Sequence, residues 1–278
     1  MNNKANPSIL ITGCSTGIGY VAATMLKSRG YRVFATARRA EDVQRLKSEG
    51  FESLQLDLTD SESISTALDE VLNLTGGTLD ALFNNGAYGQ PGAVEDLRRE
   101  ILLKQFETNV FGTQELTNRV IRVMRKQGHG RIIYNSSVLG FVAFKHRGAY
   151  VVSKYAIEGL ADTLRLELMG SNIHIVLIEP GPITSDFRKN AYKAFKDNID
   201  VESSAFHDYY IETEKRLTFD GKGQFELPAE RVGDKLIKAL ESPRPKARYY
   251  VTFPTYLFGY LKRILPTRAL DWVIAKAE

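Results

Sequence analysis

Short runs of apolar and β-branched residues alternate along this chain with longer segments in which apolar residues recur every three or four positions. The short runs have the length and composition of buried strands, and the longer segments have the spacing of helices that bury one face. Strands are therefore expected at residues 8–12, 32–36, 53–56, 79–84, 131–135, 173–178 and 248–252.

The helical segments lie between these strands. The first, Tyr20–Arg29, ends before Gly30, and a later long helix ends before Gly128, because glycine is favoured just past a helix. Thr59 and Glu62 have the spacing of a capping box for the helix after the third strand. The apolar stripes of the other helices are Ile64, Ala67, Leu68, Val71 and Leu72, then Leu116, Val120 and Met124, then Ile157, Leu160, Ala161, Leu164 and Leu168.

Strands that alternate with helices of this size predict an α/β fold, a doubly wound, Rossmann-type parallel sheet of about seven strands with helices on both faces. We expect a single domain over residues 1–278, with an aromatic insertion at about 184–228. This insertion could cover a site at the ends of the strands, or it could form ordinary surface helices packed through their rings.

Composition narrows the class of protein only a little. The net charge of +4 is scattered along the chain, which disfavours nucleic acid as a partner. The single cysteine, Cys14, excludes an intramolecular disulfide and fits a reducing compartment, so we expect a cytoplasmic protein. No signal peptide fits at Met1–Ser8, and no apolar run approaches the roughly 20 residues that cross a bilayer.

The turn between the first strand and the first helix, Thr12–Gly19, holds glycines at positions 13, 17 and 19. Glycine permits a tight turn and close approach of the backbone to a ligand. The helix that follows presents unpaired N–H groups and a positive dipole end, which suit a pyrophosphate. A glycine pattern in this strand–helix setting predicts a dinucleotide site, with Cys14 as a small filler.

The end of the second strand bears on which dinucleotide binds. NAD-binding folds usually place a carboxylate there for the ribose hydroxyls, but this chain has Arg38 and Arg39 and no acidic residue before Glu41. A guanidinium can hold a 2′-phosphate in a planar, bidentate geometry, so NADP(H) is favoured over NAD(H). The alternative is two solvent-facing arginines that begin the next helix.

Tyr150 and Lys154 open the helix after the fifth strand, one turn apart on the same face. The nearby ammonium is expected to lower the pKa of the phenol, so that it can exchange a proton with a carbonyl or alcohol oxygen. Ser136 and Ser137 end the fifth strand, where such sheets bind ligands. A hydroxyl there could bind a substrate oxygen, but for Ser136 we favour a role in capping the strand end.

Together these motifs resemble the short-chain dehydrogenase/reductase family, in its shorter, single-domain branch, from about Ile9 to Thr184. The family's glycine motif matches Thr12, Gly13, Gly17, Ile18 and Gly19, and its Tyr-x-x-x-Lys pair matches Tyr150 and Lys154. Its catalytic serine, thirteen residues before the tyrosine, falls on Ser137, and its active-site asparagine falls on Asn109. The family's adenine-contacting acid maps to Asp57, and its late Pro-Gly motif to Pro180, Gly181 and Thr184.

One motif departs from the family, because its usual Asn-Asn-Ala-Gly is replaced by Asn84-Asn85-Gly86-Ala87. Both exchanged residues are small, so close approach of the cofactor is still expected. The cofactor contacts implied by the resemblance are Gly13, Ser15, Thr16, Gly17, Ile18, Gly19, Arg38, Arg39, Asp57, Leu58, Asn85, Gly86, Ala87, Tyr150, Lys154, Pro180, Gly181, Ile183 and Thr184.

The resemblance implies an NADP(H)-dependent oxidoreductase without a metal. Tyr150 would be the general acid or base, and Lys154 would lower its pKa and bind the nicotinamide ribose. Ser137 would hold the substrate oxygen, and Asn109 would support a proton-relaying water. Family members usually pair through the helices that carry Asn109 and Tyr150, so the resemblance also implies a homodimer or homotetramer.

Apolar residues follow the serine and suggest a hydrophobic aldehyde, ketone or alcohol as substrate, although some of them could be plain core. The chain is similar to hydroxysteroid and retinol dehydrogenase-like members and to bacterial aldehyde reductases. These residues are Val138, Leu139, Phe141, Val142 and Phe144, with Tyr88 after the asparagine motif.

The apolar tail, about 253–277, could rest on a membrane surface, but we favour packing on its own domain or on a partner subunit. Two rival functions are less consistent with these motifs. A non-catalytic NADP-sensing or scaffold protein would typically lose the tyrosine or the lysine. A sugar-nucleotide epimerase or dehydratase would have another glycine spacing and a longer C-terminal part.

Overall fold

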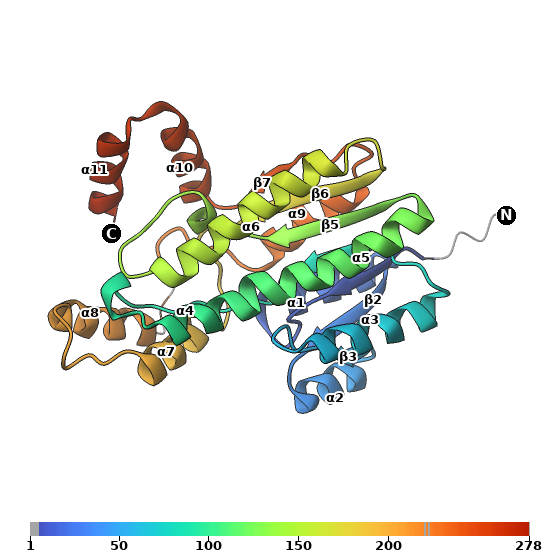
Figure 1. The fold of residues 1–278 in the computed structure, drawn as a ribbon, viewed down its shortest axis with the longest axis horizontal. Coiled ribbons are helices and arrows are strands. Elements are labelled where there is room, and N and C mark those ends of the chain that lie inside the picture. The colour runs from blue at the N-terminus through green and yellow to red at the C-terminus, as the bar shows by residue number, and fades with distance from the viewer. Residues whose placement is uncertain (1–5, 220, 222, 278) are drawn as a thin grey trace.

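The computed structural model describes residues 6–219, 221 and 223–277. Most of the polar start of the chain, two positions of the aromatic insertion and the last residue therefore lie outside the described residues. Over the described part the chain folds as expected, into one parallel sheet with helices on both faces (Figure 1).

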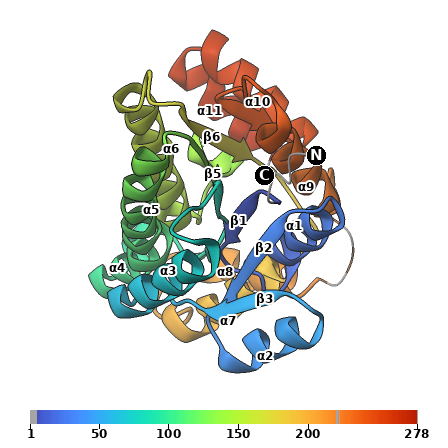
Figure 2. The same ribbon diagram turned by 90° about the vertical axis from the view of Figure 1, so that its right-hand side faces the viewer.

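The sheet found within the described ranges has seven strands in the order β3-β2-β1-β4-β5-β6-β7, and every neighbouring pair is parallel. Figure 2 shows β3, β2, β1, β5 and β6 following one another across the sheet. The expected strands are confirmed, with ends that shift by one or two residues at most places. The strands are β1 (Ser8–Ile11), β2 (Arg32–Ala37), β3 (Glu52–Gln55), β4 (Ala81–Asn84), β5 (Gly130–Asn135), β6 (Ile173–Glu179) and β7 (Arg248–Tyr250).

Each face of the sheet is covered by three helices. One face carries α1 (Gly17–Ser28), α2 (Ala40–Ser48) and α9 (Glu230–Glu241). The other face carries α3 (Ser61–Thr75), α5 (Thr113–Gln127) and α6 (Gly148–Glu167). Short helical segments complete this part of the chain: η1 (Val94–Asp96), α4 (Arg99–Phe106), the π-helical turn η2 (Glu107–Gly112) and η3 (Val138–Gly140).

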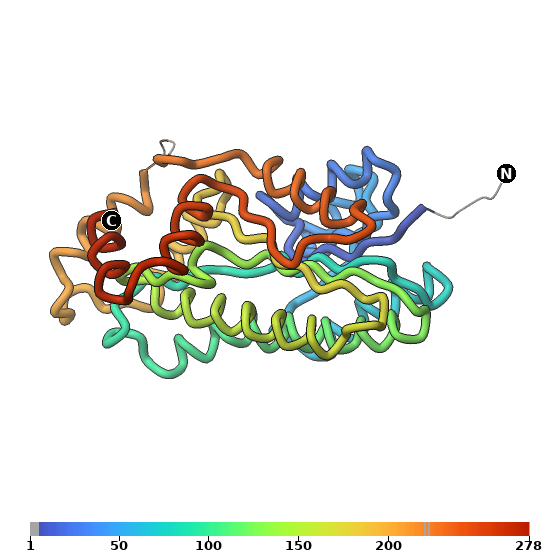
Figure 3. Tube along the Cα trace, turned by 90° about the horizontal axis from the view of Figure 1, so that it is seen from above, coloured from blue at the N-terminus to red at the C-terminus, as the bar shows by residue number. Residues whose placement is uncertain are grey.

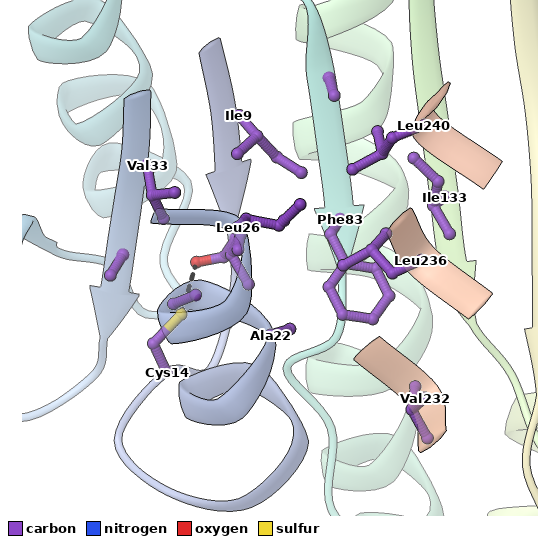
Figure 4. Close-up of a cluster of buried hydrophobic side chains, with 14 of the residues drawn as sticks. Ile9, Cys14, Ala22, Leu26, Val33, Phe83, Ile133, Val232, Leu236 and Leu240 are labelled. Atoms are coloured by element: carbon purple, nitrogen blue, oxygen red, sulfur yellow. Dashed lines mark hydrogen bonds between the residues drawn. The ribbon is translucent and has the colours of Figure 1, made fainter. Parts of the chain in front are cut away.

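The central strands are largely apolar because both of their faces are buried, whereas the outermost strand β3 begins and ends with the exposed residues Glu52 and Gln55. Successive residues of β1 point to opposite sides, so Ile9 packs beneath α1 and α9 whereas Leu10 packs beneath α3 and α5. Figure 4 shows the first of these cores, in which Leu26 and Leu236 meet Phe83 over the centre of the sheet. A rigid sheet of this kind fixes the positions of the loops at its ends.

One expected local feature is wrong. Helix α3 is capped by Asp60, whose carboxylate accepts hydrogen bonds from the backbone N–H groups of Glu62 and Ser63. Thr59 instead donates its hydroxyl hydrogen to Asp57. A carboxylate is at least as good a cap as a hydroxyl, and it also favours the positive end of the helix dipole.

The remaining segments gather at the end of the sheet where the strands terminate (Figures 1 and 3). In the insertion, α7 (Phe187–Asn198) and α8 (His207–Thr218) pack through Phe195 and Tyr210, both fully buried. The tail forms α10 (Phe253–Ile264) and α11 (Thr267–Ala277). Among the described helices, none combines the length and apolar character needed to span a membrane.

Candidate active site

The strand order reverses direction between β1 and β4, which are neighbours in the sheet although two strands separate them in sequence. In doubly wound sheets, the loops that leave such neighbouring strands part in opposite directions and open a crevice at the carboxyl ends. The glycine turn leaves β1 and the Asn84–Ala87 motif leaves β4, so both motifs lie at this switch point.

The glycine turn has the backbone that its sequence predicts. Gly13 and Gly17 have φ of +71° and +60°, a region that disfavours other residues. A Cβ on Gly19 would lie 2.2 Å from the carbonyl oxygen of Gly13, so the first turn of α1 packs directly on the loop. Thr16 is the N-cap of α1, and its side chain makes no capping hydrogen bond.

The other residues of the turn hold it in place. The Ser15 carbonyl accepts a hydrogen bond from the Arg45 guanidinium, and Ile18 packs against the core beneath α1. Cys14 is fully buried, and burial raises the pKa of its thiol to about 12, as befits a filler rather than a nucleophile. The α1 N–H groups at this turn thus fit a pyrophosphate, because no side chain of the cap competes for them.

Asn85 ties the glycine turn to the next strand. Its side-chain amide donates to the carbonyls of Thr12 and Gly13 at 2.9 and 3.2 Å. The Thr12 hydroxyl accepts in return from the backbone N–H groups of Asn85 and Gly86, at 2.9 and 2.8 Å. Gly86 lies so close to Gly13 that a Cβ on Gly13 would sit 2.8 Å from the Gly86 Cα, while Ala87 is half-buried beside it.

The same network reaches the catalytic lysine candidate. The Asn135 amide, at the end of β5, donates to the Asn85 side-chain oxygen at 2.9 Å. The Asn135 carbonyl accepts from the Lys154 ammonium at 2.7 Å. Lys154 is buried, and its Nζ lies 5.5 Å from the centre of the Tyr150 ring. These hydrogen bonds therefore join the glycine turn to Lys154, whose ammonium lies beside the Tyr150 ring.

The expected direction of the Tyr150 pKa is wrong for this structure. Burial raises the pKa of the Tyr150 phenol, and a hydrogen bond with the Ser137 hydroxyl offsets this only in part. Burial also lowers the pKa of Lys154 to about 8, although the charge of Glu158 opposes that shift. Desolvation by burial is the largest cause of both pKa shifts, and Tyr150 packs against the apolar cluster around Phe258.

The two serines after β5 have different partners. Ser137 accepts a hydrogen bond from the Leu139 N–H at 3.1 Å. Its hydroxyl also shares a hydrogen bond with the Tyr150 phenol. Ser136 does not cap the strand end, contrary to expectation. Its hydroxyl donates to Glu158 at 2.5 Å, on the side away from Tyr150 along α6.

Asn109 lies in the π-helical turn η2, where the helix between α4 and α5 widens. Its amide nitrogen donates to the Tyr88 carbonyl at 2.9 Å and to the Ser153 hydroxyl at 3.1 Å. Its side-chain oxygen accepts from the Tyr88 N–H at 3.1 Å. Asn109 thus fixes the loop after β4 against α6, and π-helical turns of this kind recur at functional sites.

The segments that follow β2 and β3 hold the residues expected to contact the adenosine part of the cofactor. Arg38 and Arg39 are both exposed, and Arg39 is the N-cap residue of α2, with its guanidinium 3.5 Å from Glu41. Asp57 accepts from the Thr59 N–H at 2.9 Å, which orients its carboxylate. Leu58 is buried, with its side chain against Gly86.

The Pro-Gly motif after β6 lies against the glycine turn. A Cβ on Gly17 would come within 3.0 Å of the Ser185 side chain, so the first and last motifs are neighbours. The Pro180 carbonyl accepts from the Val138 N–H at 2.8 Å. Ile183 pairs with Leu227, and the Thr184 N–H donates to the Leu227 carbonyl at 2.9 Å. A Cβ on Gly181 would clash with Thr252.

A partly buried ionic cluster one turn beyond Lys154 was not predicted from the sequence. Arg248 on β7 binds Glu158 at 2.9 Å, Asp162 at 2.9 Å and Glu179 at 3.1 Å. Burial and the neighbouring charge of Glu158 raise the pKa of Glu179 to about 9, and among the described residues its buried Oε2 has no hydrogen-bond partner. The only sequence signal was the spacing of four that places Lys154, Glu158 and Asp162 on one face of α6.

Apolar side chains close the site. Val138, Leu139 and Val142 are buried in a cluster with Phe258 of α10, so part of the expected pocket is core. The ring of Phe187, at the start of α7, meets the Tyr150 ring edge-on at 5.3 Å. The insertion thus packs through its own rings and also places one ring over the candidate catalytic residue.

Comparison with known proteins shows the family of this chain. The family model described as "short chain dehydrogenase" matches residues 7–195. The chain belongs to this family. Over 267 residues it is 40% identical to "Uncharacterized oxidoreductase YbbO" of Escherichia coli (strain K12), with coverage of 96% of this chain and 93% of that protein.

Two further relatives span nearly the whole chain. The "NADPH-dependent 3-dehydrocapnine reductase" of Ornithobacterium rhinotracheale is 30% identical and covers 96% of this chain and 95% of its own. A crystal structure of a short-chain dehydrogenase from Streptomyces avermitilis superposes with a TM-score of 0.78 at 26% identity, covering 98% and 97% of the two chains. The chain is therefore an NAD(P)-dependent oxidoreductase that acts on CH–OH or carbonyl groups.

Proposed function

We propose that this enzyme uses NADP(H) to interconvert hydrophobic aldehydes or ketones and their alcohols. The observation that carries the proposal is the hydrogen-bonded chain from the glycine turn through Asn85 and Asn135 to Lys154, beside the Tyr150–Ser137 pair. This chain of hydrogen bonds would join the dinucleotide site to the acid–base group at the carboxyl ends of the central strands.

The preference for NADP(H) rests on the end of β2. Arg38 and Arg39 are exposed there. No acidic residue that would repel a 2′-phosphate occurs between the end of β2 and Glu41. Arg45 also reaches the glycine turn, and its charge is paired with Asp42 and Glu49. The relative from Ornithobacterium, named for its dependence on NADPH, supports the same choice.

The cofactor would lie along the glycine turn, with the first N–H groups of α1 on its pyrophosphate and Lys154 near the nicotinamide ribose. Bound NADPH supplies the hydride. The chain's own residues manage the proton: Tyr150 donates to the substrate oxygen, and Ser137 donates a hydrogen bond to the same atom. Lys154 stabilises the phenolate that remains, because its ammonium is held nearby by the Asn135 carbonyl.

The substrate class follows from the walls of the site. Phe187 covers Tyr150, and Phe141 and Phe144 pack at the edge of the same apolar cluster. Such walls favour a hydrophobic carbonyl compound over a charged one, because burying a charge without a partner costs free energy. Phe187 must give way for a substrate to reach the phenol, so we expect α7 to move on binding.

We also propose that two copies of the enzyme pair through α5 and α6 in the cytoplasm. Phe111, in η2 just before α5, and Val152 and Leu166, both on α6, are exposed apolar residues. A second copy would remove them from water. The measurement is the molar mass in solution, with a monomer as the result that would contradict pairing.

The proposed function is tested by NADPH and NADH consumption with a panel of medium-chain and aromatic aldehydes and ketones. We expect turnover with NADPH, and Tyr150→Phe should lower kcat about a thousandfold because the proton donor is lost. NADPH affinity should stay within a few-fold. Tyr155→Phe, the same change one residue past Lys154 on the exposed side of α6, serves as the control and should keep activity.

Turnover that survives Tyr150→Phe would contradict the assignment of the acid–base group. Tight NADPH binding without turnover across the panel would favour the non-catalytic NADP sensor instead.

A further inference from the structure

Helix α10 exposes an unbroken apolar row. Phe253, Tyr256, Leu257, Tyr260 and Ile264 follow one another at helical spacing, and each is exposed. The exposed fractions reach 60% at Phe253, 59% at Tyr260 and 74% at Ile264. The opposite side of α10 is already packed on the protein through Thr255, Phe258 and Gly259. The row therefore lies on the side of α10 that faces away from the buried contacts of this helix.

The row continues onto the insertion. The ring of Phe225 lies 5.4 Å from the ring of Phe253, and both are exposed. Phe225 has φ of +58°, a strained conformation for a residue with a bulky side chain. We call these residues the aromatic ridge: Phe225, Phe253, Tyr256, Leu257, Tyr260 and Ile264.

The aromatic ridge adjoins the mouth of the active site. Two residues after Phe225, Leu227 pairs with the Pro-Gly motif through the Thr184 N–H. At the other side, Tyr250 contacts both Tyr256 and Phe141, with ring centres 5.4 and 5.7 Å apart. Figure 3 shows α10 and the insertion at the same end of the molecule, where the strands terminate.

The charges around the ridge are mostly positive. Over residues 253–277 the basic side chains are Lys262, Arg263, Arg268 and Lys276, and Asp271 is the one acidic residue. On α11, Trp272 is exposed and the Lys276 ammonium lies 4.2 Å from the centre of its ring. Tyrosine and tryptophan prefer the boundary between lipid and water, and basic residues are attracted to anionic headgroups.

We propose that the aromatic ridge docks this enzyme on an anionic lipid bilayer. The combination of exposed aromatic rings with an excess of lysine and arginine matches a headgroup layer better than it matches a protein partner, whose contact surfaces are depleted of lysine. Docking would turn the mouth of the site toward the phase in which hydrophobic carbonyl compounds accumulate. The docking surface itself does not depend on the proposed substrate class.

The test is flotation of the full chain with vesicles. We expect it to float with vesicles of equimolar phosphatidylcholine and phosphatidylglycerol, to stay behind with phosphatidylcholine alone, and to be released by high salt. Tyr260→Ser with Ile264→Ser should remove the aromatic contact. Arg263→Glu with Arg268→Glu should weaken binding at least about tenfold, because each basic residue near an anionic surface contributes substantially.

Matched controls lie at the opposite end of the sheet. Leu74→Ser removes an apolar side chain that is also exposed, and Arg125→Glu with Lys126→Glu reverses two exposed charges in the last turn of α5. Both controls should float like the parent chain, and every variant should bind NADPH normally, which shows that it is folded.

Three results would overturn the proposal. They are failure of the parent chain to float with anionic vesicles, equal loss in the ridge and control variants, and a fall in the solution mass of the chain on Tyr260→Ser with Ile264→Ser. The last would assign the ridge to contact between two copies. None of these results measures turnover, so the proposed function is tested independently of the docking proposal.

Discussion

The two ends of the active site are built in different ways. On one side, the glycine turn, Asn85, Asn135 and Lys154 are joined by hydrogen bonds between buried polar atoms. On the other side, Phe187, Phe195 and the aromatic ridge meet their neighbours through ring contacts. Hydrogen bonds require fixed directions and distances, whereas apolar contacts tolerate changes of shape. The chemistry is therefore expected to be rigid and the substrate side adaptable.

The largest effect is expected at Gly19. A Cβ there would meet the Gly13 carbonyl at 2.2 Å, and backbone atoms cannot yield, so Gly19→Ala should abolish NADPH binding and destabilise the fold by about 3 kcal/mol. Gly159→Ala is the matched control, because this glycine also lies within a helix but nothing approaches its Cβ position within 4 Å. It should stabilise the protein by up to about 1 kcal/mol in thermal unfolding.

If Gly19→Ala bound NADPH normally, the polar side of the site would be as adaptable as the apolar side, and the contrast between them would fail.

The next effect tests the apolar side. Phe195 is fully buried between α7 and α8, so Phe195→Ala should remove about 3–5 kcal/mol of packing free energy from the insertion. We expect KM for the carbonyl substrate to rise while the Kd for NADPH, measured by fluorescence, stays constant. Phe219→Ala, at an exposed ring of the same insertion, should change neither constant. A parallel loss of NADPH affinity would show that the two sides are coupled.

A smaller effect is expected at Arg38. Loss of a charge-assisted hydrogen bond to the 2′-phosphate should raise KM for NADPH about tenfold in Arg38→Ala and leave KM for NADH almost unchanged. Arg125→Ala, at a distant exposed arginine, is the control. Steady-state kinetics with both cofactors decide the matter, and equal changes would count against the phosphate contact.

The smallest effect is a dependence of stability on pH. Burial raises the pKa of Glu179 from its ordinary 4.5 to about 9, so between these values the folded chain keeps a proton that the unfolded chain has lost. The free energy of unfolding must then fall as pH rises across this window. Glu179→Gln cannot titrate, so its free energy of unfolding should not fall in this way. The Tm of the variant should therefore exceed that of the parent by a margin that grows from pH 5 to pH 9.

Glu226→Gln is the control with the opposite sign. Burial alone would raise the Glu226 pKa, but hydrogen bonds from Gly223, Thr184 and Arg188 outweigh it and lower the pKa. This carboxylate stabilises the fold above its ordinary pKa, so its replacement should lower Tm at neutral pH. A Glu179→Gln margin that does not vary with pH would place the proton elsewhere in the cluster.

The sequence predicted the sheet and its motifs because periodicity and glycine placement are local signals. The strands, Gly30 and Gly128 at helix ends, and the positive φ of Gly13 all followed from neighbouring residues. The predicted N-cap of α3 was wrong because Thr59, Asp60 and Ser61 all have side chains that can cap a helix. Only the backbone conformation decides which of them does so.

The ionic cluster could not be predicted for a different reason. Arg248 meets Glu158 across 90 residues and Glu179 across 69, so no window of sequence contains the three together. The predicted direction of the Tyr150 pKa shift was also wrong. The shift depends on burial by Phe187 and by the residues after Ser137, and not on Lys154 alone. Pairwise spacing indicates which groups are near, but the degree of desolvation is set by the whole fold.

The burial of Cys14 has a practical consequence. It is the one cysteine of the chain, and a thiol with a pKa near 12 is almost wholly protonated at neutral pH and therefore unreactive. A cysteine introduced at the exposed position Tyr260 would consequently react alone with a maleimide dye, with no need to remove the native one. The emission of that dye would then report directly whether the aromatic ridge enters a less polar environment.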